Sequence, residues 1–209
     1  MSDFFSTAEL RWFNEGNIPD IFQDTFERFH EIRQYPHRTD IYLKFPQSSC
    51  AGVKIREGRL EIKTLVSTGK EYKFRGQILG RSTIWEKWGQ SVDIPVNQVI
   101  PSDKMIKVNK KRILIGMVHK KDQIIIIYPA NNIYSHQKGC LVELAQVEIN
   151  NKKYWSINFE SWSDNDDSGK DLPHYLDFFL EHLDINTAIF KYLNPKQALS
   201  YPQFLLSLP

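Results

Sequence analysis

The stretch Val53–Lys63 reads Val-Lys-Ile-Arg-Glu-Gly-Arg-Leu-Glu-Ile-Lys, with apolar and charged residues in strict alternation. Alternation with period two predicts a strand, a tight turn and a second strand. The turn falls at Glu57-Gly58, because glycine accepts the positive φ that a two-residue hairpin loop requires. The segment therefore predicts a β-hairpin whose register is set by this turn.

That register decides which side chains share a face. Lys54 lies opposite Glu61 and Arg56 opposite Arg59, and Lys63 continues the same face. One face then holds four cations and one carboxylate, although like charges directly opposite each other destabilise a sheet. Two interpretations stay open: a solvated outer face, where water screens the repulsion, or the polar interior of a barrel that holds an anion.

Size and composition indicate one β-rich domain. The chain has 209 residues, without an internal repeat or a long linker, so we expect a single domain over 1–209 with a helical part from about 171. The net charge of +2 does not indicate a nucleic-acid surface. The chain lacks an apolar run that could span a bilayer and a signal-peptide pattern, which predicts a cytoplasmic protein without a membrane partner. Cys50 and Cys140 are expected to be reduced core residues.

Further segments predict an α+β fold. Alternating residues predict strands at 8–13, 39–45, 83–92, 106–108, 112–118 and 123–128, and a second hairpin over 140–149 and 153–162 that turns at Asn150-Asn151. Helices are expected from Pro19 to about 33, ending before Pro36, over 171–183 and over 185–193. The apolar tail, 195–209, would dock on the protein or cover a partner's groove. We expect an antiparallel β-barrel or tunnel of about eight strands with flanking helices and a C-terminal helical segment.

The segment 67–80 is polar and contains three glycines, so it is predicted to be a loop. It carries the cations Lys70, Lys73 and Arg75. A solvated loop and a lid over an anion site are both consistent with this composition.

Charged residues recur at alternating positions in strand after strand. In a flat sheet they would form a wet face, whereas in a closed barrel they would line a charged tunnel. Cations in such a tunnel would neutralise a polyanion, and carboxylates would hold a divalent metal that bridges phosphate oxygens. No nucleophile elbow, phosphate loop, zinc pair or H-E-x-x-H motif is present.

The charged segments follow a definite order. The chain presents Glu9-Leu10-Arg11-Trp12-Phe13, Asp40-Ile41-Tyr42, Lys54-Ile55-Arg56, Leu60-Glu61-Ile62-Lys63, Glu86, Lys110-Lys111-Arg112 and Leu141-Val142-Glu143-Leu144-Ala145. This order resembles the CYTH superfamily, the triphosphate tunnel metalloenzymes, over most of the chain. Members of that family carry an opening E-x-E-x-K strand, then D-x-Y, R-x-R, K-x-R and a late E-x-E.

The resemblance implies a set of site residues. Arg11 stands in place of the second acid of the opening motif, Phe13 in place of its lysine, and Ala145 in place of the second acid of the late motif. The family uses those acids to bind Mg²⁺ or Mn²⁺, so a two-metal site is not expected, and a single metal at Glu9 and Glu143 stays an open alternative. The implied ligand-binding residues are Arg11, Lys54, Arg56, Glu61, Lys63, Lys87 and Arg112.

Two functions follow from these observations. The first is binding, with hydrolysis as an open alternative, of a phosphorylated or polyanionic small ligand; an active protein would be a metal-dependent triphosphate or organic-phosphate hydrolase. The second is a non-enzymatic interaction or scaffold protein with a degenerate tunnel and a protein partner or a homodimer. They differ in whether Lys54, Arg56 and Lys63 point into a cavity or into solvent. A lipocalin-like barrel is disfavoured, because its interior would be apolar.

Overall fold

The computed structural model describes residues 3–28, 34–45, 48–92, 101–121, 123–127, 130–164, 168–182 and 187–208. The strands are β1 (Asp3–Glu15), β2 (Gln34–Leu43), β3 (Ala51–Arg56), β4 (Arg59–Phe74), β5 (Gln77–Ser91), β6 (Met105–Lys120), β7 (Gln123–Ile127), β8 (Lys138–Ile149) and β9 (Lys152–Ser163). The helices are α1 (Asp20–Arg28), α3 (Ser168–His182) and α4 (Tyr201–Ser207), with 3₁₀ turns η1 (Ser102–Lys104), η2 (Ala130–Ser135) and η3 (Thr187–Lys191).

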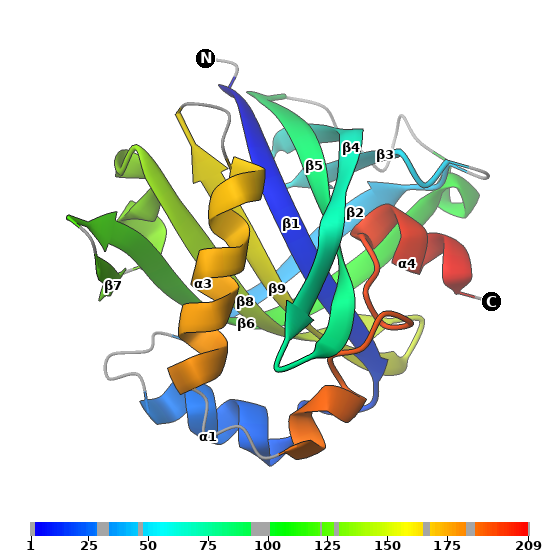
Figure 1. Ribbon diagram of the computed structural model, residues 1–209. Helices are drawn as coiled ribbons and strands as arrows, with labels where there is room; N and C mark the ends of the chain where they lie inside the picture. Colours follow the sequence, from blue (N-terminus) through cyan, green and yellow to red (C-terminus); the bar gives the residue numbers. More distant parts are fainter. Residues whose placement is uncertain are drawn as a thin grey trace.

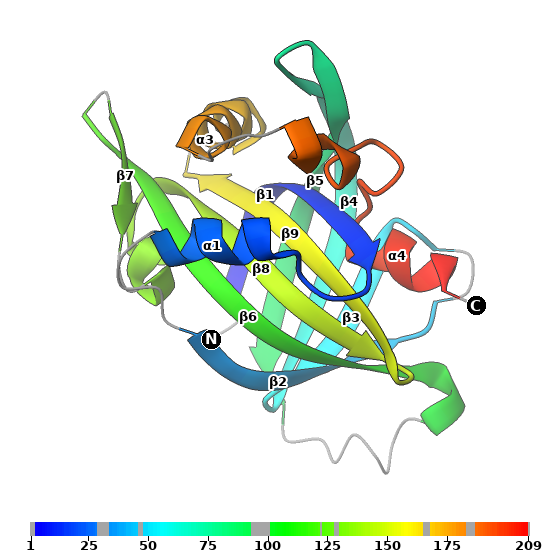
Figure 2. The ribbon, with the colours of Figure 1, turned by 90° about the horizontal axis from the view of Figure 1, so that it is seen from below.

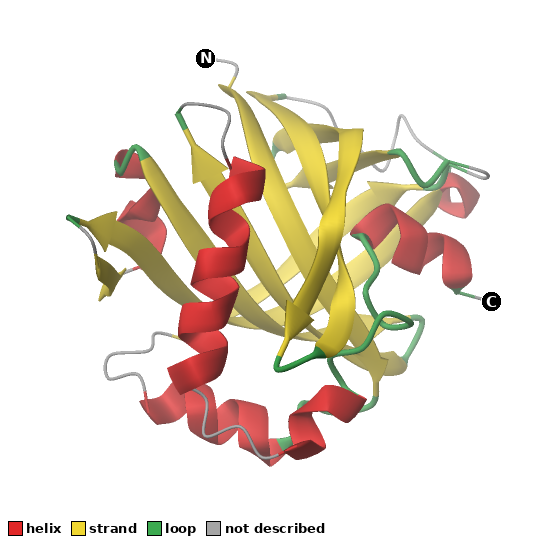
Figure 3. Ribbon diagram, in the orientation of Figure 1, coloured by secondary structure: helices red, strands yellow, loops and turns green. Residues whose placement is uncertain are grey.

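Eight strands close into an antiparallel barrel (Figure 1). Their order is β2-β3-β4-β5-β1-β9-β8-β6, and β2 pairs back onto β6, while β7 extends the sheet beside β6. The helices lie around the strands (Figure 3), and α1 crosses the sheet near β9 (Figure 2). Closure gives every barrel strand two hydrogen-bonded neighbours and one face that points inward. The predicted α+β barrel is confirmed.

The hairpin that decides the fold has the predicted turn and register. Glu57-Gly58 has φ values of 50° and 72°, as a turn with two positive φ values requires. Lys54 pairs with Glu61 and Arg56 with Arg59. The second predicted hairpin, between β8 and β9, likewise turns at Asn150-Asn151 with φ values of 50° and 62°.

The segment 67–80 is not a loop, and the lid interpretation is wrong. β4 and β5 continue through it and turn at Arg75-Gly76. Tyr72, Phe74 and Leu79 are buried in the core cluster that includes α3, and the Tyr72 hydroxyl donates to Asp177 Oδ1 of α3 at 2.7 Å. The glycines led to the prediction of a loop, although alternate side chains of this segment pack under α3.

Other predicted boundaries also need correction. β2 begins at Gln34, and its pairing with β6 shifts between Tyr35 and Arg38, which lets the strand contain Pro36, a residue that cannot donate to the ladder. The segments predicted at 106–108 and 112–118 are one strand, β6. Cys140 is buried as expected, but Cys50 is exposed. The third predicted helix is a 3₁₀ turn, η3. The end of the first predicted helix, 29–33, lies outside the described residues.

The two faces of β1 belong to different environments. Ala8, Leu10 and Trp12 point outward into the largest apolar cluster, which also contains residues of α1, α3 and η3. Glu9 and Arg11, on the other face, are buried in the barrel. The main apolar core therefore lies outside the barrel, between the strands and the helices. The barrel interior contains charged side chains such as Glu9 and Arg11.

α4 packs against the apolar end of the barrel interior, beside β2 and β3 (Figure 1). Ser200 caps the N-terminus of α4, and its hydroxyl oxygen accepts a hydrogen bond from the backbone N–H of Gln203 at 3.4 Å. Tyr201 and Phe204 are buried among inward-facing apolar side chains, and Phe204 stacks on Phe13 with ring centroids 3.8 Å apart. The apolar tail thus docks on the chain's own barrel. No helix in the described part of the chain combines the length and apolar character needed to cross a bilayer.

Truncation of the α4 anchor should destabilise the fold. Phe204→Ala removes a ring that is 5% exposed, so we expect the free energy of unfolding to fall by about 3 kcal/mol. Leu206→Ala is the matched control, because Leu206 is 43% exposed on the same helix; its effect should stay within about 0.5 kcal/mol. Urea denaturation measures both, and equal losses would contradict the packing described here.

Candidate functional site

The barrel interior encloses a cavity of about 1100 Å³. Its lining includes Tyr42 and Tyr201, the first residue of α4, and also Phe5, Tyr134 and Trp162. Protein interiors normally contain few voids larger than a water molecule, so a cavity of this size with convergent polar groups is a candidate site. A smaller cavity of about 290 Å³ between α4 and the barrel has a mixed lining, in which Lys44, Ser48 and Asn150 lie among apolar side chains.

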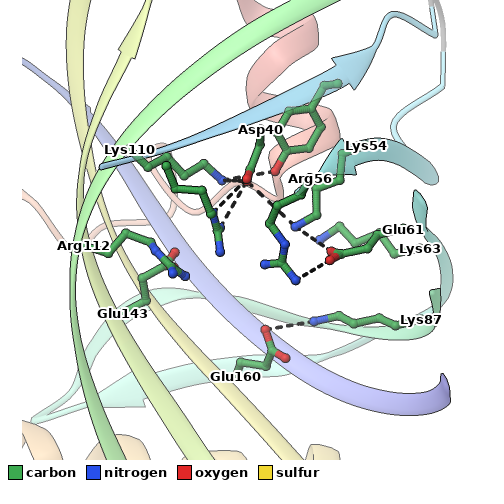
Figure 4. A network of polar contacts seen from close by, with 12 residues as sticks. Asp40, Lys54, Arg56, Glu61, Lys63, Lys87, Lys110, Arg112, Glu143 and Glu160 are labelled. Atoms are coloured by element: carbon green, nitrogen blue, oxygen red, sulfur yellow. Dashed lines mark hydrogen bonds and ion pairs between the residues drawn. The ribbon is translucent and has the colours of Figure 1, made fainter. Parts of the chain in front are cut away.

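All nine residues that the sequence singled out line the large cavity. They are Glu9, Arg11, Lys54, Arg56, Glu61, Lys63, Lys87, Arg112 and Glu143. The charged face of the Val53–Lys63 hairpin points into the barrel, toward side chains from the opposite strands (Figure 4). The solvated outer-face interpretation is therefore wrong.

Four further charged residues take part in the ion pairs of this site, and Arg59, Glu86 and Asp164 also line the cavity. Arg38, Lys110 and Glu160 line the same cavity, and Asp40 forms ion pairs within it. Asp40 and Lys110 stand in the motifs that resemble the CYTH superfamily, but the resemblance did not imply a ligand-binding role for either. Glu160 follows Phe159, which packs in the outer core cluster, so the period of the strand could have placed Glu160 on the inward face. Arg38 was missed because β2 begins at Gln34, before the predicted start at 39.

Asp40 is the centre of one ion cluster (Figure 4). Its carboxylate is fully buried and lies 2.7 Å from Lys110 Nζ, 2.8 Å from Arg38 Nε and 3.9 Å from Lys54 Nζ. Burial alone would raise the pKa of Asp40, but the three cations outweigh it and hold the pKa well below its ordinary value. Asp40 therefore stays ionised and holds three cations at the wall of the barrel interior, which we call the lumen.

Glu9 and Glu143 are each bracketed by two cations. Glu143 accepts from Arg11 Nη1 at 2.9 Å and from Arg112 Nη1 at 3.1 Å. Glu9 accepts from Lys63 Nζ at 3.0 Å and also pairs with Lys87. Burial opposes ionisation of both carboxylates, yet these cations lower the pKa of each.

The remaining carboxylates complete the network. Glu61 pairs with Lys54 at 2.9 Å and with Arg56, and Glu160 pairs with Lys87 at 2.9 Å. Among the described residues, these lumen ion pairs join eight cations to five carboxylates, so positive charge is in excess. The cations are Arg11, Arg38, Lys54, Arg56, Lys63, Lys87, Lys110 and Arg112.

Burial makes several of these lysines unusually acidic. Loss of hydration lowers the pKa of Lys54, Lys63 and Lys110 from 10.5 to about 8, and neighbouring carboxylates offset only part of this effect. Lys87 differs, because Glu160 and Glu9 together overcome burial and raise its pKa. An additional anion in the cavity would stabilise the charged form of each lysine.

The site does not fit the divalent metal that the resemblance implies. No cluster of three or more His, Cys, Asp or Glu side chains that could hold a metal ion occurs among the described residues. Glu9 and Glu143 already accept from two cationic side chains each. Mg²⁺ or Mn²⁺ at either carboxylate would have to displace those cations or lie against them, at a cost in Coulomb repulsion.

Comparisons with known proteins give weak likenesses. No family model and no curated protein matches the chain. The solved PH1819 protein of Pyrococcus horikoshii is 15% identical with a TM-score of 0.46, over 96% of this chain and 98% of that chain. A conserved hypothetical protein of Pyrococcus furiosus is 12% identical with a TM-score of 0.45, over 97% and 99%. The S. pombe Pct1 RNA triphosphatase is 10% identical with a TM-score of 0.38, over 91% and 86%. At these values the likenesses carry no argument about function.

The acidity of the lumen lysines can be measured directly. NMR of ¹³C-labelled lysine side chains should show three amines that titrate near pH 8 instead of 10.5, because burial disfavours their charged form. Lys63→Met should remove one of these titrations and so assign it. If all lysines titrate above pH 10, the lumen is hydrated much more than this structure implies.

Proposed function

We propose that the chain is a CYTH-like tunnel protein that binds a phosphorylated small molecule in the barrel cavity. One observation carries this proposal: eight buried or half-buried cations converge on a cavity and outnumber the carboxylates that hold them. Buried ion pairs contribute little net stability compared with apolar packing of similar volume. A charged interior around a cavity of this size is therefore better explained by a polyanionic ligand than by the needs of the fold.

The cations retain capacity for such a ligand while they are paired. A lysine ammonium has three N–H donors and a guanidinium has five. Lys63, for example, donates to Glu9 with one part of that capacity. Phosphate oxygens that enter the cavity can accept the remaining hydrogens as short, charge-assisted hydrogen bonds. The carboxylates would then hold the cations in position instead of competing with the ligand.

The geometry favours binding over hydrolysis. A general base works best when its pKa lies near the working pH, but the lumen cations lower the pKa of Glu9, Asp40 and Glu143. These carboxylates are therefore weak bases toward a water molecule. Arg11 also brings a guanidinium to Glu143 in place of an acid, so we propose that this cavity holds its anion with side-chain cations and without a metal.

The rival proposal, an interaction protein, depended on outward charges and an apolar tail. Lys54, Arg56 and Lys63 line the cavity instead. The buried residues of α4, Tyr201 and Phe204, pack into the chain's own apolar cluster. These two features therefore do not support the rival proposal.

A lumen cation should be needed for anion binding. Tripolyphosphate should raise the thermal unfolding midpoint of the wild-type protein in a concentration-dependent way, because it binds only the folded state. Lys63→Met should weaken tripolyphosphate binding about tenfold or more, the effect of one charge-assisted hydrogen bond.

Lys73→Met is the matched control. Lys73 is exposed on β4 and does not line the cavity, so its removal should leave the shift unchanged. The absence of a shift in the wild type, or equal losses in both variants, would contradict the proposal.

A further inference from the structure

We propose that the smaller cavity, between α4 and the barrel, is a second binding site, and that it takes a small molecule with a carboxylate group and a short apolar chain. The cavity has a volume of about 290 Å³, close to the lower limit of the roughly 300–1,000 Å³ typical of small-molecule sites. It therefore has room for a compact ligand. The inference does not depend on the binding of an anion in the large cavity of the lumen.

Apolar side chains of α4 and of the strand ends beside it form most of this lining. Leu205 and Leu206 contribute from α4, and Ile106 and Ile149 from β6 and β8. Phe45 is 39% exposed and Leu206 is 43% exposed, so two of the six large apolar side chains that are exposed in the described part of the chain meet at this cavity. An apolar chain in the cavity would cover this surface, and removal of apolar surface from water favours binding.

The polar part of the lining favours an anion. Lys44, Ser48 and Asn150 contribute side chains that can donate hydrogen bonds, and the described residues that line the cavity include no Asp or Glu. Each lumen lysine pairs with a carboxylate, whereas Lys44 is exposed and forms no ion pair with any described residue. A ligand carboxylate, which only accepts hydrogen bonds when it is ionised, complements this set of donors.

The two cavities share a wall. Tyr42 and Gly52 line both of them. A Cβ atom on Gly52 would lie 3.2 Å from Cγ of Pro202, which lines the smaller cavity, and 3.5 Å from Cγ of Lys63, which lines the large one. This close packing separates the two cavities, so each can hold its own ligand.

Octanoate and 1-octanol test the charge of the ligand, because they share the same carbon chain and only octanoate is an anion. In calorimetric titrations, Lys44→Met should weaken the binding of octanoate about fivefold, as expected for one exposed charge pair, and leave the binding of 1-octanol unchanged. Lys104→Met is the matched control. The Lys104 side chain is 66% exposed and does not line the cavity, so its removal should change neither affinity.

Butanoate tests the apolar part of the site, because it has the same carboxylate and a shorter chain. Each methylene group that is buried changes an affinity by a factor of about four, so butanoate should bind at least about tenfold more weakly than octanoate. NMR of ¹³C-labelled leucine methyl groups locates the ligand. Octanoate should shift the signals of Leu205 and Leu206 and leave that of Leu180, buried in the core under α3, in place.

The outcomes separate this proposal from anion binding in the lumen. Equal effects of Lys44→Met on octanoate and 1-octanol, equal losses in the two lysine variants, or an absence of shifts at Leu205 and Leu206 would overturn the second site. Equal affinities for butanoate and octanoate would overturn its apolar part. Lys44→Met should keep its affinity for tripolyphosphate. A wild-type protein that binds octanoate but not tripolyphosphate would contradict the proposed function and leave the second site intact.

Discussion

The pairing of β2 with β6 is the constraint on which the rest of this structure depends. It converts one face of a sheet into an enclosed interior, so side chains that would be solvated in an open sheet have to satisfy one another. Asp40 lies on β2 and Lys110 on β6, and their ion pair of 2.7 Å joins the two strands that close the barrel. Closure and the charged lumen are thus two aspects of one arrangement.

The apolar clusters that stabilise the protein and the charged side chains that would bind a ligand lie in different parts of the barrel. The largest apolar cluster lies outside the barrel, between the strands and the helices α1 and α3, while a second cluster with α4 fills one end of the interior. The ion pairs between these regions are a poor source of net stability. They do keep cations such as Lys63 and Lys87 directed into the cavity, where an anion can reach them.

The amino-acid sequence predicts the local parts of this arrangement and not the long-range ones. The turn at Glu57-Gly58 sets a register that period-two alternation then extends, so Lys54, Arg56 and Lys63 could be assigned to one face. Whether that face points into the barrel or into solvent depends on closure between strands far apart in the chain. Only the order of the short charged motifs indicated a closed barrel. The position of Glu143 between Arg11 and Arg112 depends on register across four strands, β1, β9, β8 and β6, and no local pattern encodes it. The segment 67–80 was wrongly predicted to be a loop, because what stabilises it as a strand is packing against α3, which follows about a hundred residues later in the chain.

The measurement that tests the account most directly is a calorimetric titration of tripolyphosphate into the protein, first in EDTA and then in Mg²⁺. If side-chain cations hold the anion, binding should occur in EDTA, and it should weaken above about pH 8 as Lys54, Lys63 and Lys110 lose their charge. Mg²⁺ should not strengthen it. Binding that appears only when Mg²⁺ is present would contradict the account, because the lumen carboxylates would then be metal ligands and not partners of the cations beside them.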